Sequence, residues 1–129
     1  MAKTPEEWLV QAEDDMATAE FIFNSGRYVY AVFFAHLAIE KALKAIYHKK
    51  FNELPPRTHS LTGLLKMNEL IPPPVISEFI LDLDHASVAT RYPEELMKLR
   101  LAYPRSVVEG IVAHTKEVLE WEKKMFKRF

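Results

Sequence analysis

The side chains best placed for chemistry follow a nearly apolar run in the first half of the chain. Only His36 interrupts the apolar character of the run from Tyr28 to Ile39. On a helix that turns by about 100° per residue, a set of side chains here falls within a sector of about 140°. We call this set the polar seam: His36, Glu40, Lys41, Lys44 and His48. A helix that is otherwise apolar must be buried by other elements, so the sequence predicts a central helix with one polar face.

Two interpretations of the polar seam stay open. Glu40 and Lys44 are four residues apart, in the order that favours an ion pair on a helix, which is typical of an exposed, salt-bridged stripe. The alternative is a cationic groove for a phosphate or a nucleotide. In that case His59 and Arg91 would add charge from neighbouring segments. The groove therefore requires three segments of the chain to converge.

The segment from Thr58 to Leu61 reads Thr-His-Ser-Leu and stands where a short helix is expected to begin. The amide groups at a helix start can hold an anion, which would bring His59 to the ligand. The simpler interpretation is that Thr58 or Ser60 caps the helix. Because such a cap leaves His59 free, the two interpretations are compatible.

Arg91 stands directly before Tyr92 and Pro93, which places a guanidinium in a loop. The planar guanidinium suits a phosphate or a carboxylate, and Tyr92 could stack on a base. Alternatively, Arg91 pairs with a carboxylate of the same chain and holds the loop down. The candidates for that pairing are Glu40, Asp82 and Asp84.

Other kinds of site find little support in the sequence. The 129 residues contain no cysteine, which excludes thiol catalysis and thiolate metal ligands. His36 and Glu40 have a spacing that suits two metal ligands, but no second pair accompanies them. Glycine-rich phosphate loops and catalytic-triad spacings are absent as well. We therefore predict no catalytic residue, no metal and no cofactor, and the net charge of −1 argues against a general nucleic-acid binder.

Prolines and glycines divide the chain into the helices that would position these groups. Thr4 and Glu7 form a capping box, and Gly26 stops the first helix in a short turn, so the second helix should return antiparallel. Glu122 interrupts the apolar stripe of the last helix, and we expect it at the edge of that stripe. The periodicity predicts long helices at about 4–24, 27–50, 74–89 and 104–127, a short helix from Thr58 or His59, and a helical turn at about 94–99.

These elements predict an all-α protein, an up-down bundle of four long helices plus one short helix, in a single domain over residues 1–129. Eight Phe, five Tyr and two Trp are many for so small a bundle to bury, which favours a homodimer. The apolar runs are shorter than the roughly 20 residues of a membrane span, and the N-terminus has no apolar signal region. We expect a cytoplasmic protein that does not bind membranes.

Several motifs, in order along the chain, resemble those of the HEPN (higher eukaryotes and prokaryotes nucleotide-binding) domain. They are Asp14 and Asp15 with Ala19, the run from Phe34 to Ala45, Thr58 to Leu61, and Ala89 to Pro93. The resemblance implies a helical bundle that forms homodimers around a shared cleft. It also implies a small nucleotidyltransferase as partner, in some cases as a toxin–antitoxin pair. The ligand-binding positions that it implies, for a nucleotide or a polyanion, are Glu40, Lys41, Lys44, His59, Arg91 and Tyr92.

The sequence departs from the ribonuclease branch of that family. HEPN ribonucleases carry an arginine followed, after four to six residues, by a histidine. Counting on from Arg91, the corresponding positions hold Leu96, Met97 and Lys98, so the usual acid–base partner for attack by the 2′-hydroxyl is missing. The resemblance therefore favours a non-catalytic binding subunit of a nucleotidyltransferase, with an RNA-cleaving toxin as the alternative.

Overall fold

The computed structural model describes residues 4–89 and 96–129, and over these ranges the chain is helical with no strand. Its elements are α1 (Pro5–Asn24), α2 (Tyr28–Phe51), α3 (Leu61–Met67), α4 (Pro74–Ala89), α5 (Leu96–Ala102) and α6 (Arg105–Lys127). The prediction of an all-α bundle with four long helices is confirmed. A second short helix, α5, is formed where only a turn of helix was predicted, and it extends as far as Ala102.

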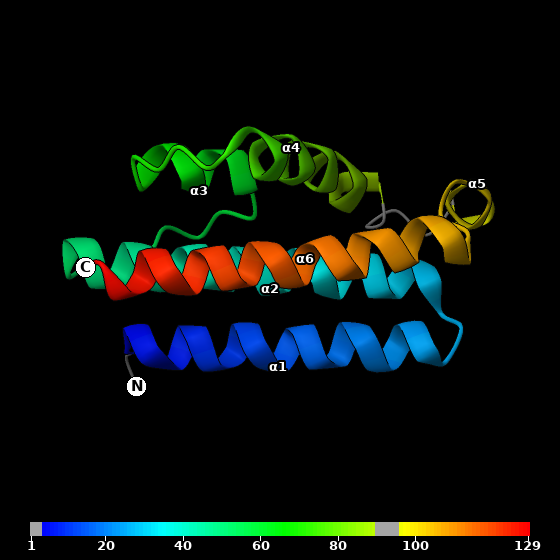
Figure 1. The fold of residues 1–129 in the computed structure, drawn as a ribbon, viewed down its shortest axis with the longest axis horizontal. Coiled ribbons are helices and arrows are strands. Elements are labelled where there is room, and N and C mark those ends of the chain that lie inside the picture. The colour runs from blue at the N-terminus through cyan, green and yellow to red at the C-terminus, as the bar shows by residue number, and fades with distance from the viewer. Residues whose placement is uncertain (1–3, 90–95) are drawn as a thin grey trace.

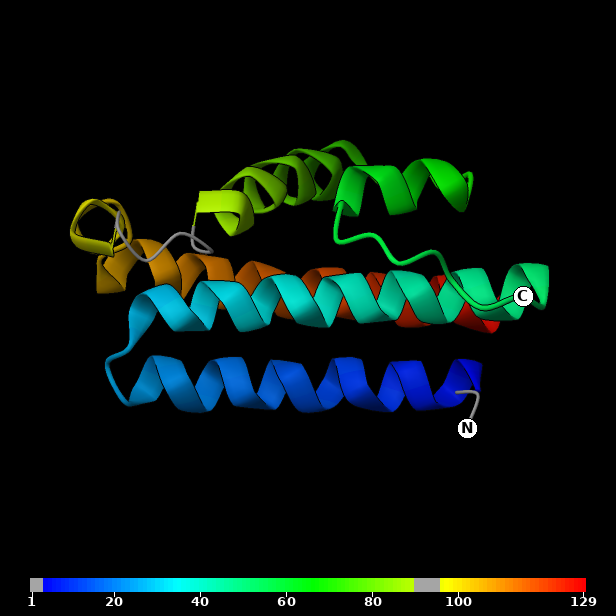
Figure 2. The same cartoon turned by 180° about the vertical axis from the view of Figure 1, so that it is seen from behind.

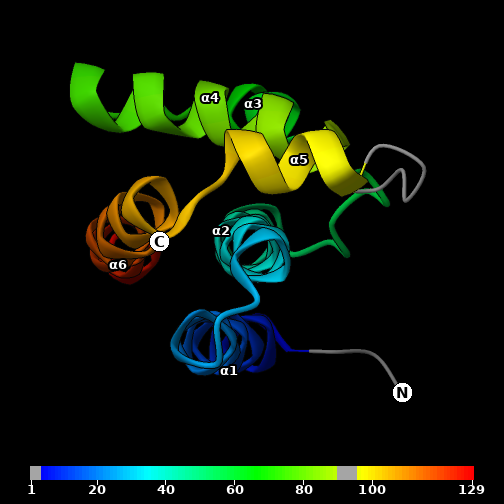
Figure 3. The same cartoon turned by 90° about the vertical axis from the view of Figure 1, so that its right-hand side faces the viewer.

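The long helices run alternately up and down, with α2 in the middle of the bundle. Figure 1 shows α1 along one side of α2, α6 beside α2, and the pair α3 and α4 along the side opposite to α1. The view from behind shows the same layers, with the linker from α2 to α3 crossing over the face of α2 (Figure 2). α5 crosses the end of the bundle at which α2 begins (Figure 3). The face of α2 that α3 and α4 cover is the face that carries the candidate site.

The first helical hairpin forms as its sequence signals predict. Thr4 caps α1, because its Oγ1 accepts a hydrogen bond from the amide of Glu7 (3.2 Å) and its own amide donates to the Glu7 carboxylate (3.0 Å). Gly26 has a φ of 89°, a left-handed conformation that side chains with a Cβ rarely adopt. The turn at Gly26 lets α2 return antiparallel along α1.

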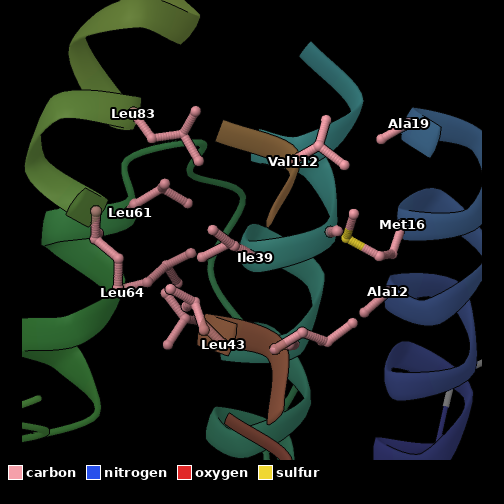
Figure 4. Close-up of a cluster of buried hydrophobic side chains, with 14 of the residues drawn as sticks. Ala12, Met16, Ala19, Ile39, Leu43, Leu61, Leu64, Leu83 and Val112 are labelled. Atoms are coloured by element: carbon pink, nitrogen blue, oxygen red, sulfur yellow. The ribbon is translucent and has the colours of Figure 1, made fainter. Parts of the chain in front are cut away.

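The core lies on both sides of α2. Figure 4 shows Ile39 and Leu43 of α2 among side chains from α1 and from α3 and α4. Alanines alternate with branched residues along α2, which allows α1 and α6 to approach its backbone closely. The buried apolar residues of α2 are Val29, Ala31, Val32, Ala35, Ala38, Ile39, Ala42, Leu43, Ala45 and Ile46. None of the described helices combines the length and hydropathy that a membrane span requires.

Glu122 does not lie at the edge of α6 as predicted: its side chain is fully buried. Val118 lies one turn before Glu122 and Phe126 one turn after it, so the three residues share one face of α6. That face packs against the core, and Glu122 is therefore buried with its neighbours. Neither of its carboxyl oxygens has a hydrogen-bond partner among the described residues. Burial raises the pKa of Glu122 well above its ordinary value, so the core holds this group as a neutral acid.

Candidate functional site

Three of the five residues of the polar seam are buried rather than exposed. His36, Glu40 and Lys44 have exposed fractions of 1%, 3% and 7%. The predicted ion pair between Glu40 and Lys44 is present, but the interpretation of these residues as a solvent-exposed stripe is wrong. The stripe is buried because α3 and α4 pack against this side of α2, and because the linker before α3 crosses it (Figures 1 and 2). Charged groups in such a place require partners, and the structure supplies them.

Glu40 is the centre of these contacts. Its Oε2 accepts a hydrogen bond from Nζ of Lys44 at 3.1 Å, one turn further along α2. Both of its carboxylate oxygens lie 3.1 Å from Nδ1 of His59. Nδ1 of His36, one turn earlier on α2, lies 3.6 Å from Oε1. Charge-assisted contacts from two elements therefore surround one buried carboxylate.

Asp84 of α4 is the second carboxylate of the site, and it holds the start of α3. Its Oδ1 accepts a hydrogen bond from the amide of Leu61 (3.1 Å), and its Oδ2 accepts from the amide (3.3 Å) and the hydroxyl (3.2 Å) of Thr62. Partial burial raises the pKa of Asp84, but the hydrogen bonds from Leu61, Thr62 and His36 outweigh it, so the pKa lies below its ordinary value. Asp84 is therefore an ionised side-chain clamp between α4 and α3.

His36 joins the two carboxylates. Its Nε2 lies 3.4 Å from Oδ1 of Asp84, while its Nδ1 faces Glu40. We call the connected group of side chains the Glu40–Asp84 cluster. Its members are His36, Glu40, Lys44, His59 and Asp84. The cluster links α2, the segment before α3, and α4, so three separate parts of the chain converge at one place.

The local sequence explains how His59 reaches this cluster. Asn52 ends α2 in a left-handed conformation (φ 55°), and the extended linker that follows contains Pro55 and Pro56. Ser60 then caps α3 by accepting a hydrogen bond from the amide of Gly63 at 3.0 Å. The prediction that Thr58 or Ser60 caps this helix is confirmed for Ser60. The residue before the cap, His59, lies over α2 with 59% of its side chain exposed.

The structure brings together three of the residues predicted to bind a ligand: Glu40, Lys44 and His59. Lys41 lies elsewhere, because its Nζ pairs with Oδ2 of Asp15 on α1 at 2.8 Å. The other two predicted residues, Arg91 and Tyr92, lie outside the described residues.

The sequence placed His36 in the polar seam but not among the ligand-binding positions, and it did not assign Asp84 to the site. His36 was recognised as part of the polar seam, and its position one turn before Glu40 was the available signal. Asp84 lies one turn after Ile80 and directly after Leu83, both buried, so it falls on the inward face of α4. An acid on the inward stripe of a helix is the pattern that would have identified it.

The cluster is a mixed-charge site. While both imidazoles are neutral, its two carboxylates outweigh the single ammonium of Lys44, and protonation of the imidazoles reverses that balance. His59 is the exposed member. Its Nδ1 faces the Glu40 carboxylate, and its Nε2 makes no hydrogen bond with a described residue. Across the described residues, no group of three His, Asp or Glu side chains is arranged to hold a metal ion.

Comparison with known proteins gives one family. A family model described as the HEPN domain matches residues 5–125. The crystal structure of ST0689, an archaeal HEPN homologue, superposes with a TM-score of 0.76 at 24% identity, over 97% of this chain and 99% of that chain. The crystal structure of TT1696 from Thermus thermophilus superposes with a TM-score of 0.79 at 25% identity, over 94% and 97% of the two chains. No curated protein matches the chain significantly.

Proposed function

This chain belongs to the HEPN domain family, and on that basis we propose that it is a nucleotide- or polyanion-binding module that acts as the dimeric partner, or substrate-binding subunit, of a small nucleotidyltransferase. The observation that supports the binding role most is the convergence of three segments on the Glu40–Asp84 cluster. The one exposed member of that cluster is His59. A ligand would therefore reach the cluster at the imidazole of His59.

The composition of the cluster suits a nucleotide better than a simple anion. A nucleotide carries phosphates, which bind ammonium and imidazolium groups, and it also carries hydroxyl and amino groups, which donate to carboxylates. His59, the exposed member, offers the first kind of partner, and the Glu40 carboxylate beside it offers the second. The site is also held in place, because Glu40 contacts both Lys44 and His59 and the Nζ of Lys44 lies 5.8 Å from the ring of Trp8. Preorganised partners reduce the ordering that binding requires.

Calorimetric titration tests the binding role directly. Titrations with ATP, GTP, CTP, UTP and a polyuridylate should give measurable heat with at least one of these ligands. His59→Ala should weaken that binding by about tenfold, the loss expected for one charge-assisted hydrogen bond. His85→Ala is the matched control, because His85 is an exposed histidine of α4 outside the cluster. Absence of heat with every ligand would contradict the proposal.

The partnership and the homodimer are tested separately. Exposed apolar side chains are frequent from just before α4 to the start of α6, and they include Ile71, Val75, Leu81, Met97, Leu101 and Val107. Such a surface favours association with another chain. Light scattering at micromolar concentration should give the mass of a dimer, and a monomer would contradict the homodimer.

A small nucleotidyltransferase encoded beside this gene should co-elute with the protein, and separate elution would contradict the partnership.

RNA cleavage is the second candidate, and the orientation of His59 by Glu40 favours it. A carboxylate that holds one imidazole nitrogen fixes the tautomer and leaves the other nitrogen to exchange a proton with a substrate. The arginine–histidine motif of the HEPN ribonucleases is absent from this sequence, so His59 would have to act unconventionally. RNA degradation that persists unchanged in His59→Ala would remove this candidate.

A further inference from the structure

A concave site lies at the opposite end of α2 from the linker to α3. The first residues of α2 and the end of α5 enclose a pocket of about 340 Å³. Figure 3 shows both segments at the end of the molecule that faces the viewer. The pocket is lined by Gly26, Arg27, Tyr28, Val29, Tyr30, Arg100 and Tyr103. Its volume lies at the lower end of the range for small-molecule sites, roughly 300–1,000 Å³.

The charge that the described residues bring to this pocket is positive. Arg27 and Arg100, which are far apart in the sequence, both line it, and none of the described lining residues is a carboxylate. Neither guanidinium makes an ion pair or hydrogen bond with another described residue. Lys44, by contrast, is buried and already paired with Glu40. Two such guanidinium groups in one concavity are the better partners for a dianionic phosphate, because each offers a planar fork of N–H donors.

Three tyrosines, Tyr28, Tyr30 and Tyr103, also line the pocket. The ring of Tyr28 packs against Phe23 with 5.5 Å between centroids, which fixes its position. Tyr30 is 46% exposed and offers an accessible ring. Tyr103 is half-buried, and burial raises the pKa of its hydroxyl, which therefore stays a neutral hydrogen-bond donor. Aromatic faces beside a cationic groove are the combination that holds a nucleobase next to its phosphate.

We propose that this pocket, separate from the Glu40–Asp84 cluster, binds a phosphate monoester attached to a planar base. Arg27 and Arg100 hold the phosphate, and the base lies against the tyrosine rings. The ligand class is a mononucleotide or the 5′-phosphorylated end of an RNA, which share this chemistry. Because its residues are not those of the cluster, this inference stands independently of the proposed function.

The test is a calorimetric titration of the wild-type protein and single variants with AMP. Arg27→Gln and Arg100→Gln should each weaken AMP binding by about tenfold, as expected for the loss of one charge-assisted contact. Arg57→Gln and Arg128→Gln are the matched controls, since both arginines are exposed at other places, and they should bind AMP as the wild type does. Circular dichroism should be the same for all four variants, because these side chains are exposed.

Titrations with other ligands distinguish the contribution of the phosphate from that of the base. They also distinguish a free nucleotide from the end of an RNA as the ligand. Adenosine and ribose 5-phosphate should each bind more weakly than AMP. A 5′-phosphorylated tetraribonucleotide that binds more tightly than AMP identifies an RNA end as the ligand, and weaker binding identifies the free nucleotide. Equal affinities of AMP and adenosine, or unchanged AMP affinity in both arginine variants, overturn the inference. AMP binding lost only in His59→Ala also overturns it, while supporting the cluster as the nucleotide site.

Discussion

Nδ1 of His59 lies 3.1 Å from both carboxylate oxygens of Glu40, although one residue is more than half exposed and the other is buried. This contact connects solvent to a network that continues through His36 to Asp84. Glu40 therefore has two tasks. It neutralises Lys44 inside the bundle, and it orients the imidazole that a ligand would meet. These two tasks can be tested separately.

Glu40→Gln should destabilise the protein strongly. The substitution preserves shape but leaves the ammonium of Lys44 buried without its counter-charge, and breaking a buried ion pair in this way costs about 3–5 kcal/mol. Urea denaturation measures the loss. Glu109→Gln is the control, because Glu109 and Arg105 form a pair in which both side chains are well exposed, and it should cost about 1 kcal/mol or less. Similar losses for the two variants would contradict a buried, charged Glu40–Lys44 pair.

Asp84→Asn should weaken the clamp between α4 and α3 and reduce the acid sensitivity of the fold. Loss of a carboxylate that caps backbone amides typically costs about 0.5–2 kcal/mol. The folded-state pKa of Asp84 lies below its ordinary value of 3.8, so its stabilising effect is present above that value and is lost as the pH falls through the lower, folded-state pKa. Denaturation curves from neutral pH down to about pH 2 should show a smaller fall for Asp84→Asn than for the wild type. Equal falls would show that Asp84 is not held as an anion.

Glu122→Met should stabilise the protein at neutral pH. Burial raises the folded-state pKa of Glu122, so its neutral form is accommodated fully at low pH, and stability falls as the pH rises above its ordinary value of 4.5. A buried polar group without a hydrogen-bond partner costs about 1–3 kcal/mol, and an apolar side chain of similar size removes that cost. The gain should be larger near pH 8 than near about pH 4. Glu117→Met, at an exposed position of α6, should show no such pH dependence, and a gain of equal size at both pH values would contradict the buried neutral acid.

Lys41→Ala should leave nucleotide binding nearly unchanged, within about twofold, because the ammonium of Lys41 faces Asp15 and not the cluster. The lost ion pair is partly exposed and should cost about 1 kcal/mol or less. Calorimetry and urea denaturation measure the two effects. A tenfold loss of affinity would show that Lys41 takes part in the ligand site, as the family resemblance implies.

The helices were predictable because local signals determine them. Thr4 with Glu7 and the glycine at position 26 act within one or two turns of the chain, and the structure confirms both. The spacing of His36, Glu40 and Lys44 likewise placed them on one face. Local spacing did not reveal that this face would be buried, since that depends on where α3 and α4 pack.

Local spacing was also insufficient to predict which acidic side chains are buried. Asp82 and Asp84 are both acids in the same turn of α4, yet Asp82 is exposed and Asp84 is partly buried. Only the direction of the inward stripe separates them. Glu122 was misplaced for the related reason that an apolar stripe was assumed to exclude a carboxyl, whereas the packed face of α6 buries whichever residue occupies that position. The burial of Asp84 and Glu122 therefore depends on long-range packing between helices, which local sequence patterns do not reveal.

The most direct test of the ligand site is an NMR titration that follows the imidazole resonances of the five histidines during addition of the nucleotide whose calorimetric affinity His59→Ala weakens and Arg100→Gln does not. The resonances of His59 should shift saturably, with the same dissociation constant as the calorimetric titration. Those of His114, on α6 and beside Phe79, should stay in place. Saturable binding with no change at His59, or with shifts confined to His114, would contradict the Glu40–Asp84 cluster as the place where the ligand binds.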